Sequence, residues 1–338
     1  MKQSKFDETL DDILVKAKEI LSRDITRKSF LKILAAFGAF LAFSSNTAKK
    51  AFAQNAKPLN PRNRRSVTTD FDLTAVTGDN IDAVTRKGVE LLGGMGKFVR
   101  KGDVVVVKPN IGWNRTPEYA ANTNPAVVAS VIKMCFESGA KTVKVFDNPC
   151  NDQKLCYVNS GIMQAAKDAG ATVFYMDDWK YAPAKFASSG ALMNEWLFFK
   201  DAVDCDSFIN VPIAKTHGLG TLTLSLKNMM GITGGNRSQI HWEMDKKLAE
   251  IYDFIKPDLN IIDAYNILTA NGPRGGNLAD VAKKLTVIAS ADPVLADSYA
   301  SKTLFNINAA TIPHIKKAAD YGLGTMDIAN ARIKTLRI

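Results

Sequence analysis

Residues 204–242 read DCDSFINVPIAKTHGLGTLTLSLKNMMGITGGNRSQIHW, and this stretch predicts how the rest of the chain is arranged. Its apolar run, Phe208–Ile213, is followed at once by Lys215 and His217, as happens when a buried strand leaves a sheet for a polar loop. Open α/β sheets bind ligands at that end of their strands. The stretch therefore predicts a buried strand with a candidate site directly after it.

The second half of the stretch carries two more candidate site residues. Lys227 lies within an apolar run, and a lysine in such a run is seldom buried without a partner. His241 follows a glycine-rich turn at Gly231–Gly235, which we expect to fold it back toward His217. A buried ion pair between Lys227 and Asp263 is the alternative explanation of the lysine that needs no chemistry.

Strand and helix patterns alternate along the remaining chain. Strands are predicted at 66–76, 103–107, 142–146, 172–176, 259–262, 285–289 and 331–338, and helices at 79–92, 124–138, 158–169, 238–255, 294–304 and 311–321. Asp79 or Asn80 is the expected cap of the first helix, and Asn124 or Pro125 opens the second. The alternation predicts an α/β fold with a mostly parallel sheet and helices on both faces, in one domain or two subdomains.

Composition narrows the classes of function. The chain has 338 residues, 46% of them hydrophobic, which allows a large core. Of the net charge of +10, residues 1–53 contribute ten Lys/Arg against six Asp/Glu, leaving +6 on the remainder. That excess is mild, and it forms no long basic run or aromatic-interleaved patch of the kind nucleic-acid binders carry. We therefore expect no nucleic-acid partner and a weak attraction to small anions.

Residues 1–53 are predicted to be an export signal with a long charged leader. Thr26–Lys32 precedes an apolar segment at 33–43, which is shorter than the ~20 residues of a membrane span. Ala51–Ala53 supplies a cleavage site. The segment resembles a twin-arginine (Tat) signal with Lys28 in place of the second arginine, while a Sec signal or an uncleaved anchor stays open. The resemblance implies the Tat machinery as a partner, a periplasmic or otherwise exported location, and no stable membrane span after processing.

A proline- and arginine-rich linker is predicted at 54–65, with the α/β domain at 66–338. Within that domain, polar residues follow several predicted strands. Because the carboxyl ends of parallel strands meet at one edge of a sheet, we expect these residues to converge there. A flexible glycine-rich loop adds an arginine suited to clamp a carboxylate or phosphate. The residues concerned are Lys108, Asn110, Lys215, His217, Asp263, Asn266, Asp292 and the loop's Arg274.

Several motifs recur in order along the chain, and together they resemble the domain of unknown function 362 family. They are VVVKPN at 105–110, a helix opened by NP at 124, INVPIAKTH at 209–217, LKNMMG at 226–231, RxxxH at 237–241, IIDA at 261–264 and GP at 272. The likeness covers most of residues 100–325. Some relatives add a ferredoxin-like cluster domain, whereas this chain has no C-x2-C-x2-C run among its four cysteines.

A more distant resemblance is to lactate racemase, whose nickel pincer cofactor is tethered to a lysine. His217, Lys227 and His241 follow one another at spacings similar to those of the racemase's catalytic histidine, tether lysine and nickel-ligating histidine. The resemblance implies that His217 is an acid/base, Lys227 an anchor for cofactor or substrate, and His241 a metal ligand. Leu224–Leu226 stands where the racemase has glycines, and no histidine precedes His217.

The favoured hypothesis is an exported cofactor- or metal-dependent enzyme that acts on a small anionic, carboxylate-like substrate by proton transfer or isomerisation. A divalent metal and a nickel-type organic cofactor are both candidates. The alternatives are an exported binding protein without turnover and an accessory to redox enzymes. The candidate residues are His217, Lys215 and Lys108 for catalysis, Lys227, Asn110, Asn228 and Arg274 for cofactor binding, and His241 and Asp263 for a metal.

Two further expectations concern the remaining reactive side chains. Cys150 and Cys156 flank a short polar loop, so in an oxidising compartment a disulfide between them is predicted, with Cys135 and Cys205 reduced. His314 lies beside lysines in a predicted helix and is expected to face solvent.

Export predicts a mature N-terminus at or near Gln54, because the cleavage motif ends at Ala53. Mass spectrometry of the protein purified from its native host should find a chain that begins there. A cytoplasmic protein that keeps Met1 would contradict the prediction.

Overall fold

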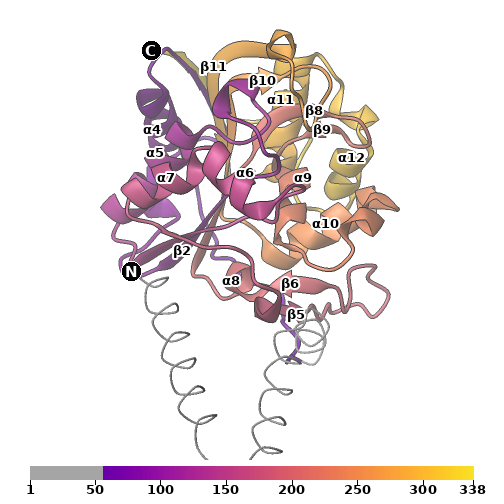
Figure 1. The fold of residues 1–338 in the computed structure, drawn as a ribbon. Helices are drawn as coiled ribbons and strands as arrows, with labels where there is room; N and C mark the ends of the chain where they lie inside the picture. The colour runs from indigo at the N-terminus through magenta and orange to yellow at the C-terminus, as the bar shows by residue number, and fades with distance from the viewer. Residues whose placement is uncertain (1–55) are drawn as a thin grey trace, which may run out of the picture. The chain divides into compact units, whose positions relative to one another are not determined.

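The computed structural model describes residues 56–338, which form an α/β domain around a large sheet (Figure 1). Its strands are β1 (Leu73–Thr77), β2 (Val104–Pro109), β3 (Thr142–Val145), β4 (Thr172–Val173), β7 (Ser207–Val211), β8 (Ile213–His217), β9 (Thr221–Thr223), β10 (Leu259–Leu268), β11 (Val281–Ser290) and β12 (Ile333–Arg337). They lie in the order β12, β1, β11, β10, β7, β2, β3, β4, with β8 beside β10 and β9 beside β8. Most pairs are parallel, but β11 is antiparallel to both of its neighbours.

Helices cover both faces of the sheet. One face carries α4 (Ile81–Leu91), α5 (Pro125–Glu137), α6 (Gln153–Asn159) and α7 (Ile162–Asp168), and the other carries α9 (Ser225–Asn228), α10 (Met244–Ile255), α11 (Pro293–Phe305) and α12 (Pro313–Asp320). Figure 1 shows α4, α5 and α7 on one side and α10, α11 and α12 on the other. The predicted α/β class, a mostly parallel sheet with helices on both faces, is confirmed.

The central strands supply both hydrophobic cores, because successive residues of a strand point to opposite faces. In β2, Val105 and Val107 pack in the core under α4–α7, and Val106 packs in the core under α9–α12. Both faces are apolar, so the sequence of this strand reads as a continuous run rather than an alternation.

Side-chain caps fix the starts of the helices that were expected to have them. The Asn80 side chain accepts the Ala83 N–H and caps α4, and the Asn124 side chain accepts the Ala126 N–H and caps α5. Both lie at positions named from the sequence.

Two helices differ in extent from their prediction. The helix expected at 158–169 is two helices, α6 and α7, because Gly161 takes a left-handed φ of 72° between them. The helix expected at 238–255 begins only at Met244, because Glu243 has a φ of 56°. His241 consequently lies in a separate short turn, η5 (Arg237–His241).

The described part of the segment expected to be a linker is instead an ordered part of the domain. The Leu59 N–H donates to the Pro183 carbonyl. The Arg62 guanidinium is buried, pairs with Asp258, and also donates to the Cys205 carbonyl. A charge that has lost its water needs such partners, so this contact holds the chain before β1 against the sheet.

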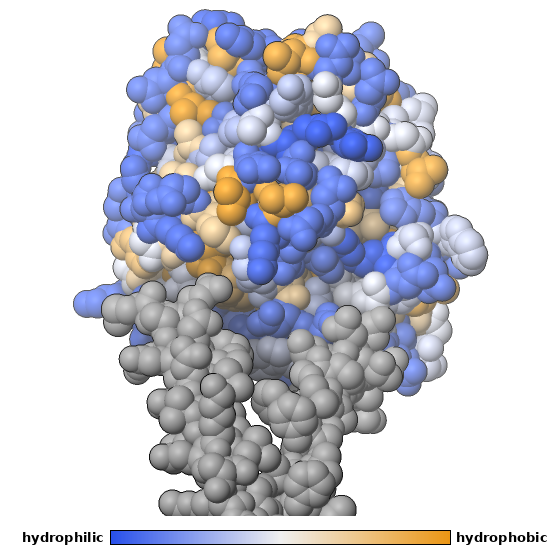
Figure 2. All heavy atoms as spheres, in the orientation of Figure 1, coloured by the Kyte–Doolittle hydropathy of each residue, from blue (hydrophilic) through white to orange (hydrophobic). Residues whose placement is uncertain are grey.

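Figure 2 shows one face of the described part, with hydrophilic residues over most of it and hydrophobic ones in small groups. Among residues 56–338 there is no helix long and apolar enough to cross a bilayer. The predicted export signal and the predicted cleavage point before Gln54 lie outside the described residues.

The Arg62 contact predicts a large energetic effect for a residue expected to be a linker. Arg62→Ala leaves Asp258 buried and unpaired, so it should lower the free energy of unfolding by about 3–5 kcal/mol. Arg86→Ala is the control, because its ion pairs with Asp82 and Glu137 are exposed and such pairs contribute about 0–1 kcal/mol. Denaturant unfolding measures both. Equal losses would show that Arg62 is not part of the folded core.

Candidate functional site

A cavity of about 440 Å³ lies at the carboxyl ends of β2 and β8. Its walls come from the segments after β2 and β3, from β8, from α9 and from η5. Its volume falls within the roughly 300–1,000 Å³ of small-molecule sites. The predicted site residues that line it are Asn110, Lys215, His217, Lys227, Asn228 and His241.

His217 is held as a neutral ring with its proton on Nε2. Its Nδ1 accepts the backbone N–H groups of Leu219 and Gly220, both at 3.1 Å, so Nδ1 carries no proton. Burial and the charges of Lys227 and Lys215 lower the pKa of His217 to about 3. The ring therefore offers its Nε2–H as a hydrogen-bond donor. The other tautomer, with the proton on Nδ1, is disfavoured because that proton would point at the N–H groups of Leu219 and Gly220.

His241 has the opposite tautomer. Its Nδ1 lies 3.2 Å from the Ser238 carbonyl, which only accepts, so Nδ1 holds the proton and Nε2 keeps a lone pair. Burial and the charge of Lys227 lower the pKa of His241. The rings of His217 and His241 stack with centroids 6.0 Å apart and planes 27° apart. A hydrogen-bond donor and a proton acceptor thus lie side by side on the cavity wall.

Lys227 is buried with a weak partner. Its side chain lines the cavity, and its Nζ donates to the Met230 thioether at 2.7 Å. No carboxylate of the described residues forms a salt bridge with it, so the ion pair with Asp263 that the sequence suggested is not formed. Burial lowers the pKa of Lys227 to about 8.

Lys215 is also buried but has strong acceptors. Its Nζ donates to Asn110 Oδ1 at 3.0 Å and to the Ala121 carbonyl at 2.6 Å. Burial lowers the pKa of Lys215 to about 7. The Asn110 amide nitrogen in turn donates to Asn228 Oδ1 at 3.0 Å, so these three polar side chains form one connected network.

Lys108, a predicted catalytic residue, does not line the cavity and lies behind its wall. Its Nζ pairs with Asp147 Oδ1 at 2.8 Å, and both side chains are buried. The other Asp147 oxygen accepts the Ile111 N–H at 2.6 Å. A Cβ at Gly231 would lie 1.8 Å from Asp147 Oδ1, so only glycine fits over this pair. Lys108 therefore supports Asp147, which faces the cavity.

The arginine that lines the cavity is Arg237, which was not assigned a role from the sequence. It donates to the Asn148 and Pro149 carbonyls, each at 2.7 Å. Arg274, the predicted anion clamp, is exposed, and only its neighbour Pro273 lines the cavity. The signal for Arg237 was its place in the RxxxH motif, four residues before His241.

The metal site predicted at His241 and Asp263 is not formed. Asp263 is in the middle of β10, not at a strand end, and its two oxygens accept the Asn124 N–H at 2.7 Å and the Tyr265 N–H at 3.0 Å. Burial raises the pKa of Asp263 to about 6. Among residues 56–338 no three His, Cys, Asp or Glu side chains are grouped to hold a metal ion. The described residues therefore do not fit a metal ion held by His241 and Asp263.

His314 is buried on α12, not solvent-facing as expected. Its side chain is 1% exposed, and neither ring nitrogen has a hydrogen-bond partner among the described residues. Burial and the charge of Lys227 lower its pKa to about 4. The lysines beside it in sequence lie on other faces of the helix, because helical neighbours point in different directions. All three histidines of the chain thus lie within the electrostatic reach of Lys227.

The predicted disulfide is absent, because Cys150 and Cys156 are both free thiols. Asp152 caps α6, and this helix turns Cys156 into the core. Cys150 lies before the helix, is exposed, and lines the cavity.

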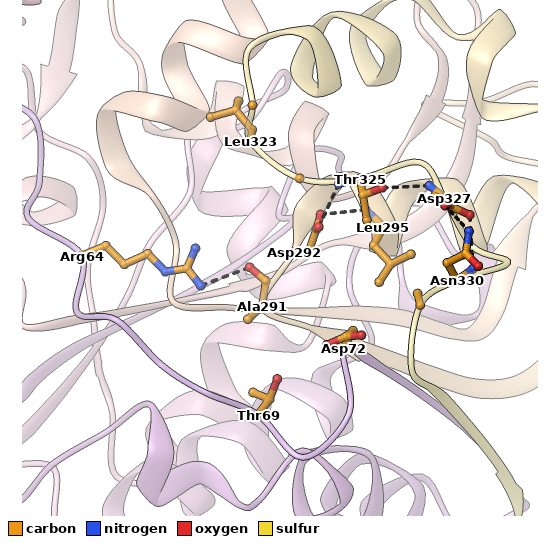
Figure 3. Close-up of a pocket in the computed structure, with 13 residues that line it drawn as sticks. Arg64, Thr69, Asp72, Ala291, Asp292, Leu295, Leu323, Thr325, Asp327 and Asn330 are labelled. Atoms are coloured by element: carbon orange, nitrogen blue, oxygen red, sulfur yellow. Dashed lines mark hydrogen bonds between the residues drawn. The ribbon is translucent and has the colours of Figure 1, made fainter.

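A second cavity, of about 520 Å³, lies at the opposite edge of the sheet, where β11 ends (Figure 3). Its polar groups bind one another. Arg64 donates to the Ala291 carbonyl at 3.1 Å, and Asp292 accepts the Leu295 and Thr325 N–H groups. Asp292 therefore caps α11, and we place the candidate site at the first cavity, where Lys227 has only a thioether to bind.

Fold and cavity together define an α/β protein whose mostly parallel sheet carries a cation-lined cavity at the carboxyl ends of its strands. The chain belongs to the family described as domain of unknown function (DUF362), whose family model matches residues 105–302, more than half of the chain. This confirms the resemblance seen in its motifs.

Two known proteins are similar to this chain. A thylakoid-associated protein of Synechocystis is 28% identical over 251 residues, which cover 71% of this chain and 75% of that protein. The structure is also similar to that of the lactate racemase apoprotein from Thermoanaerobacterium thermosaccharolyticum, with a TM-score of 0.37 and 10% identity. That match covers 70% of this chain and 60% of the racemase chain.

The lowered pKa of His314 predicts how stability depends on pH. Between the ordinary pKa of 6.5 and about 4, the unfolded state binds a proton that the folded state does not, so stability falls as the pH falls. In His314→Leu, the free energy of unfolding should fall less with falling pH than in the wild type, by up to about 1.4 kcal/mol per pH unit. It should also stabilise the protein at pH 7, because two unpaired nitrogens leave the core.

Denaturant unfolding of both proteins at pH 7 and pH 5 tests this. Asp263 and Asp297, whose pKa values burial raises, act with the opposite sign in both proteins. The difference between wild type and variant therefore isolates His314. Parallel pH dependences would show that His314 titrates normally.

Proposed function

We propose that this protein is an enzyme that binds a small carboxylate-like anion in the His217–Lys227 cavity and transfers a proton to or from it. The observation that carries the proposal is the pair of complementary histidine tautomers beside cations that no described carboxylate neutralises. Each part of the arrangement has a separate role.

The cations are the binding groups. Lys215, Lys227 and Arg237 line the cavity, whereas the carboxylate of Asp147 is already paired with Lys108. A carboxylate about 4 Å from one such cation gains about 4 kcal/mol at an effective dielectric constant near 20. Arg237 is held by its two carbonyl contacts with its guanidinium at the wall, which suits it to bind a planar carboxylate.

The histidines divide the chemistry. His241 Nε2 has a lone pair and is the candidate base that removes a proton from a carbon next to the carboxylate. The neutral His217 ring stabilises the negative charge that then develops on oxygen, through its Nε2–H. This shifts the proton-moving role, which the sequence suggested for His217, to His241.

A metal or nickel-type organic cofactor is not needed for this chemistry. His241 Nε2 and the Lys227 amine are the groups that would contact such a cofactor, and the described residues hold no group of three His, Cys, Asp or Glu side chains that could bind a metal ion. The proposal therefore uses the side chains of the chain itself.

Binding without turnover is the second candidate. It is favoured by the fixed hydrogen bonds of Lys215 and Arg237, which preorganise the cavity for an anion whether or not a proton moves.

We also propose that the protein is exported, with the Tat machinery as its route and a periplasmic or comparable compartment as its location. The Thr26–Lys32 motif and the Ala51–Ala53 cleavage site support this. The name of the Synechocystis relative, which associates that protein with thylakoids, supports a membrane-associated or exported setting.

Binding and proton transfer are tested separately. Nuclear magnetic resonance titration with acetate, lactate and pyruvate should show binding that Arg237→Gln weakens by at least tenfold. Arg274→Gln is the matched control, because Arg274 is exposed and outside the cavity, and it should bind as wild type does. Equal effects of the two variants would place the anion elsewhere.

Proton transfer is read out as exchange of carbon-bound hydrogen for deuterium in D2O. His241→Gln should keep the anion affinity and lose about 10²–10⁴-fold of the exchange rate. Binding with no exchange in the wild type would leave the second candidate, a binding protein.

A further inference from the structure

Lys227 differs from the other basic groups of the cavity in what it binds. Lys215 Nζ donates to an amide oxygen and a carbonyl, and Arg237 donates to two carbonyls. Lys227 Nζ has only the Met230 thioether, a weak acceptor, among the described residues. Lys227 is 7% exposed and lines the cavity, so the amine has protein on most sides and open space on the cavity side. An amine in this setting gains little from being charged.

We propose that Lys227 is a nucleophile that forms an imine with the carbonyl carbon of an oxo carboxylate, such as a 2-oxo acid, bound in the cavity. This inference rests on the proposed anion-binding function and names its substrate class. At a pKa of about 8, about one tenth of the Lys227 side chains are neutral amines at pH 7, which is enough for attack.

The neighbours of Lys227 fit this reaction. A Cβ built at Gly220 would lie 3.3 Å from Lys227 Cε and 3.7 Å from His217 Nδ1, so the lysine and the histidine approach each other across this glycine. His217 Nε2–H stabilises the oxyanion formed when the amine attacks the carbonyl. His241 lines the same cavity as Lys227, and its ring stacks on that of His217 with centroids 6.0 Å apart.

The step is balanced without any other reactant. The amine nitrogen bonds to the carbonyl carbon as the carbon–oxygen π bond opens, and His241 Nε2 takes a proton from nitrogen. His241 returns this proton to the oxygen, which gives a hydroxyl group. It then takes the second proton from nitrogen and passes it to the hydroxyl group, which leaves as water while the carbon–nitrogen double bond forms. The imine withdraws electrons from the adjacent carbon, so His241 can then remove a proton there, as the proposed function requires.

Reductive trapping tests the inference. The full chain is incubated with pyruvate and sodium cyanoborohydride. Lactate, which has a hydroxyl group in place of the ketone carbonyl of pyruvate, is the control ligand. Intact mass and peptide mapping should find a stable adduct on Lys227 with pyruvate, formed faster as the pH rises toward 8, and no adduct with lactate.

Two matched variants locate the amine. Lys227→Arg keeps the positive charge but has no primary amine, so it should lose at least nine tenths of the adduct, and its pyruvate affinity is measured alongside by nuclear magnetic resonance. Lys284→Arg, at an exposed position of β11, should retain the adduct in full. Circular dichroism checks that both variants fold.

The outcomes separate this inference from the proposed function. Pyruvate that binds without forming an adduct, or an adduct that persists in Lys227→Arg, overturns the imine inference and leaves anion binding in place. Adducts confined to exposed lysines overturn it as well. Loss of all carboxylate binding in the wild type would overturn both.

Discussion

The buried Lys108–Asp147 pair is the contact on which the cavity depends. It joins the end of β2 to the segment after β3, with the Lys108 side chain fully buried and the Asp147 side chain 3% exposed. Removing two charges from water costs several kcal/mol for each, so the pair is stable only while its partners stay in place. One of those partners, Asn228, lines the cavity. Asp147 holds the Ile111 N–H, and Lys108 holds Asn228 Oδ1. Gly231 is the position whose lack of a side chain allows the pair to form beneath it.

Backbone groups around the cavity determine which nitrogen of each histidine carries its proton. Two successive N–H groups of the loop after β8 fix the His217 proton on one nitrogen, and a carbonyl of η5 fixes the His241 proton on the other. Burial, together with the nearby charge of Lys227, lowers the pKa of both rings and keeps them neutral. An anion bound beside these groups would raise their pKa values again, so binding and proton uptake are coupled at this site.

The sequence predicted the sheet and most of the cavity, because both follow from local patterns. Apolar runs marked the buried strands, and the polar residues after them marked the edge where Asn110 and His217 meet. The prediction that Asp263 lies at a strand end was wrong because β10 continues to Leu268. The length of this strand depends on its pairing with β11 rather than on its own apolar run. Arg237 was missed because its RxxxH motif does not by itself show that the side chain turns into the cavity, which depends on the tertiary structure. His314 was misassigned because the helix that buries it is packed against α10, a long-range contact.

The position of β1 has a consequence for how the chain is made. The first strand of the sheet has no partner near it in sequence: Leu73 pairs with Ser290 on one side and with Ile333 on the other. A nascent chain leaves the ribosome from its N-terminus, so this strand is synthesised long before either neighbour exists. The edge of β1 stays unpaired while almost the whole domain is synthesised. An unpaired strand edge can pair with the wrong strand during that time. The sheet therefore closes only after β11 and β12 have been synthesised.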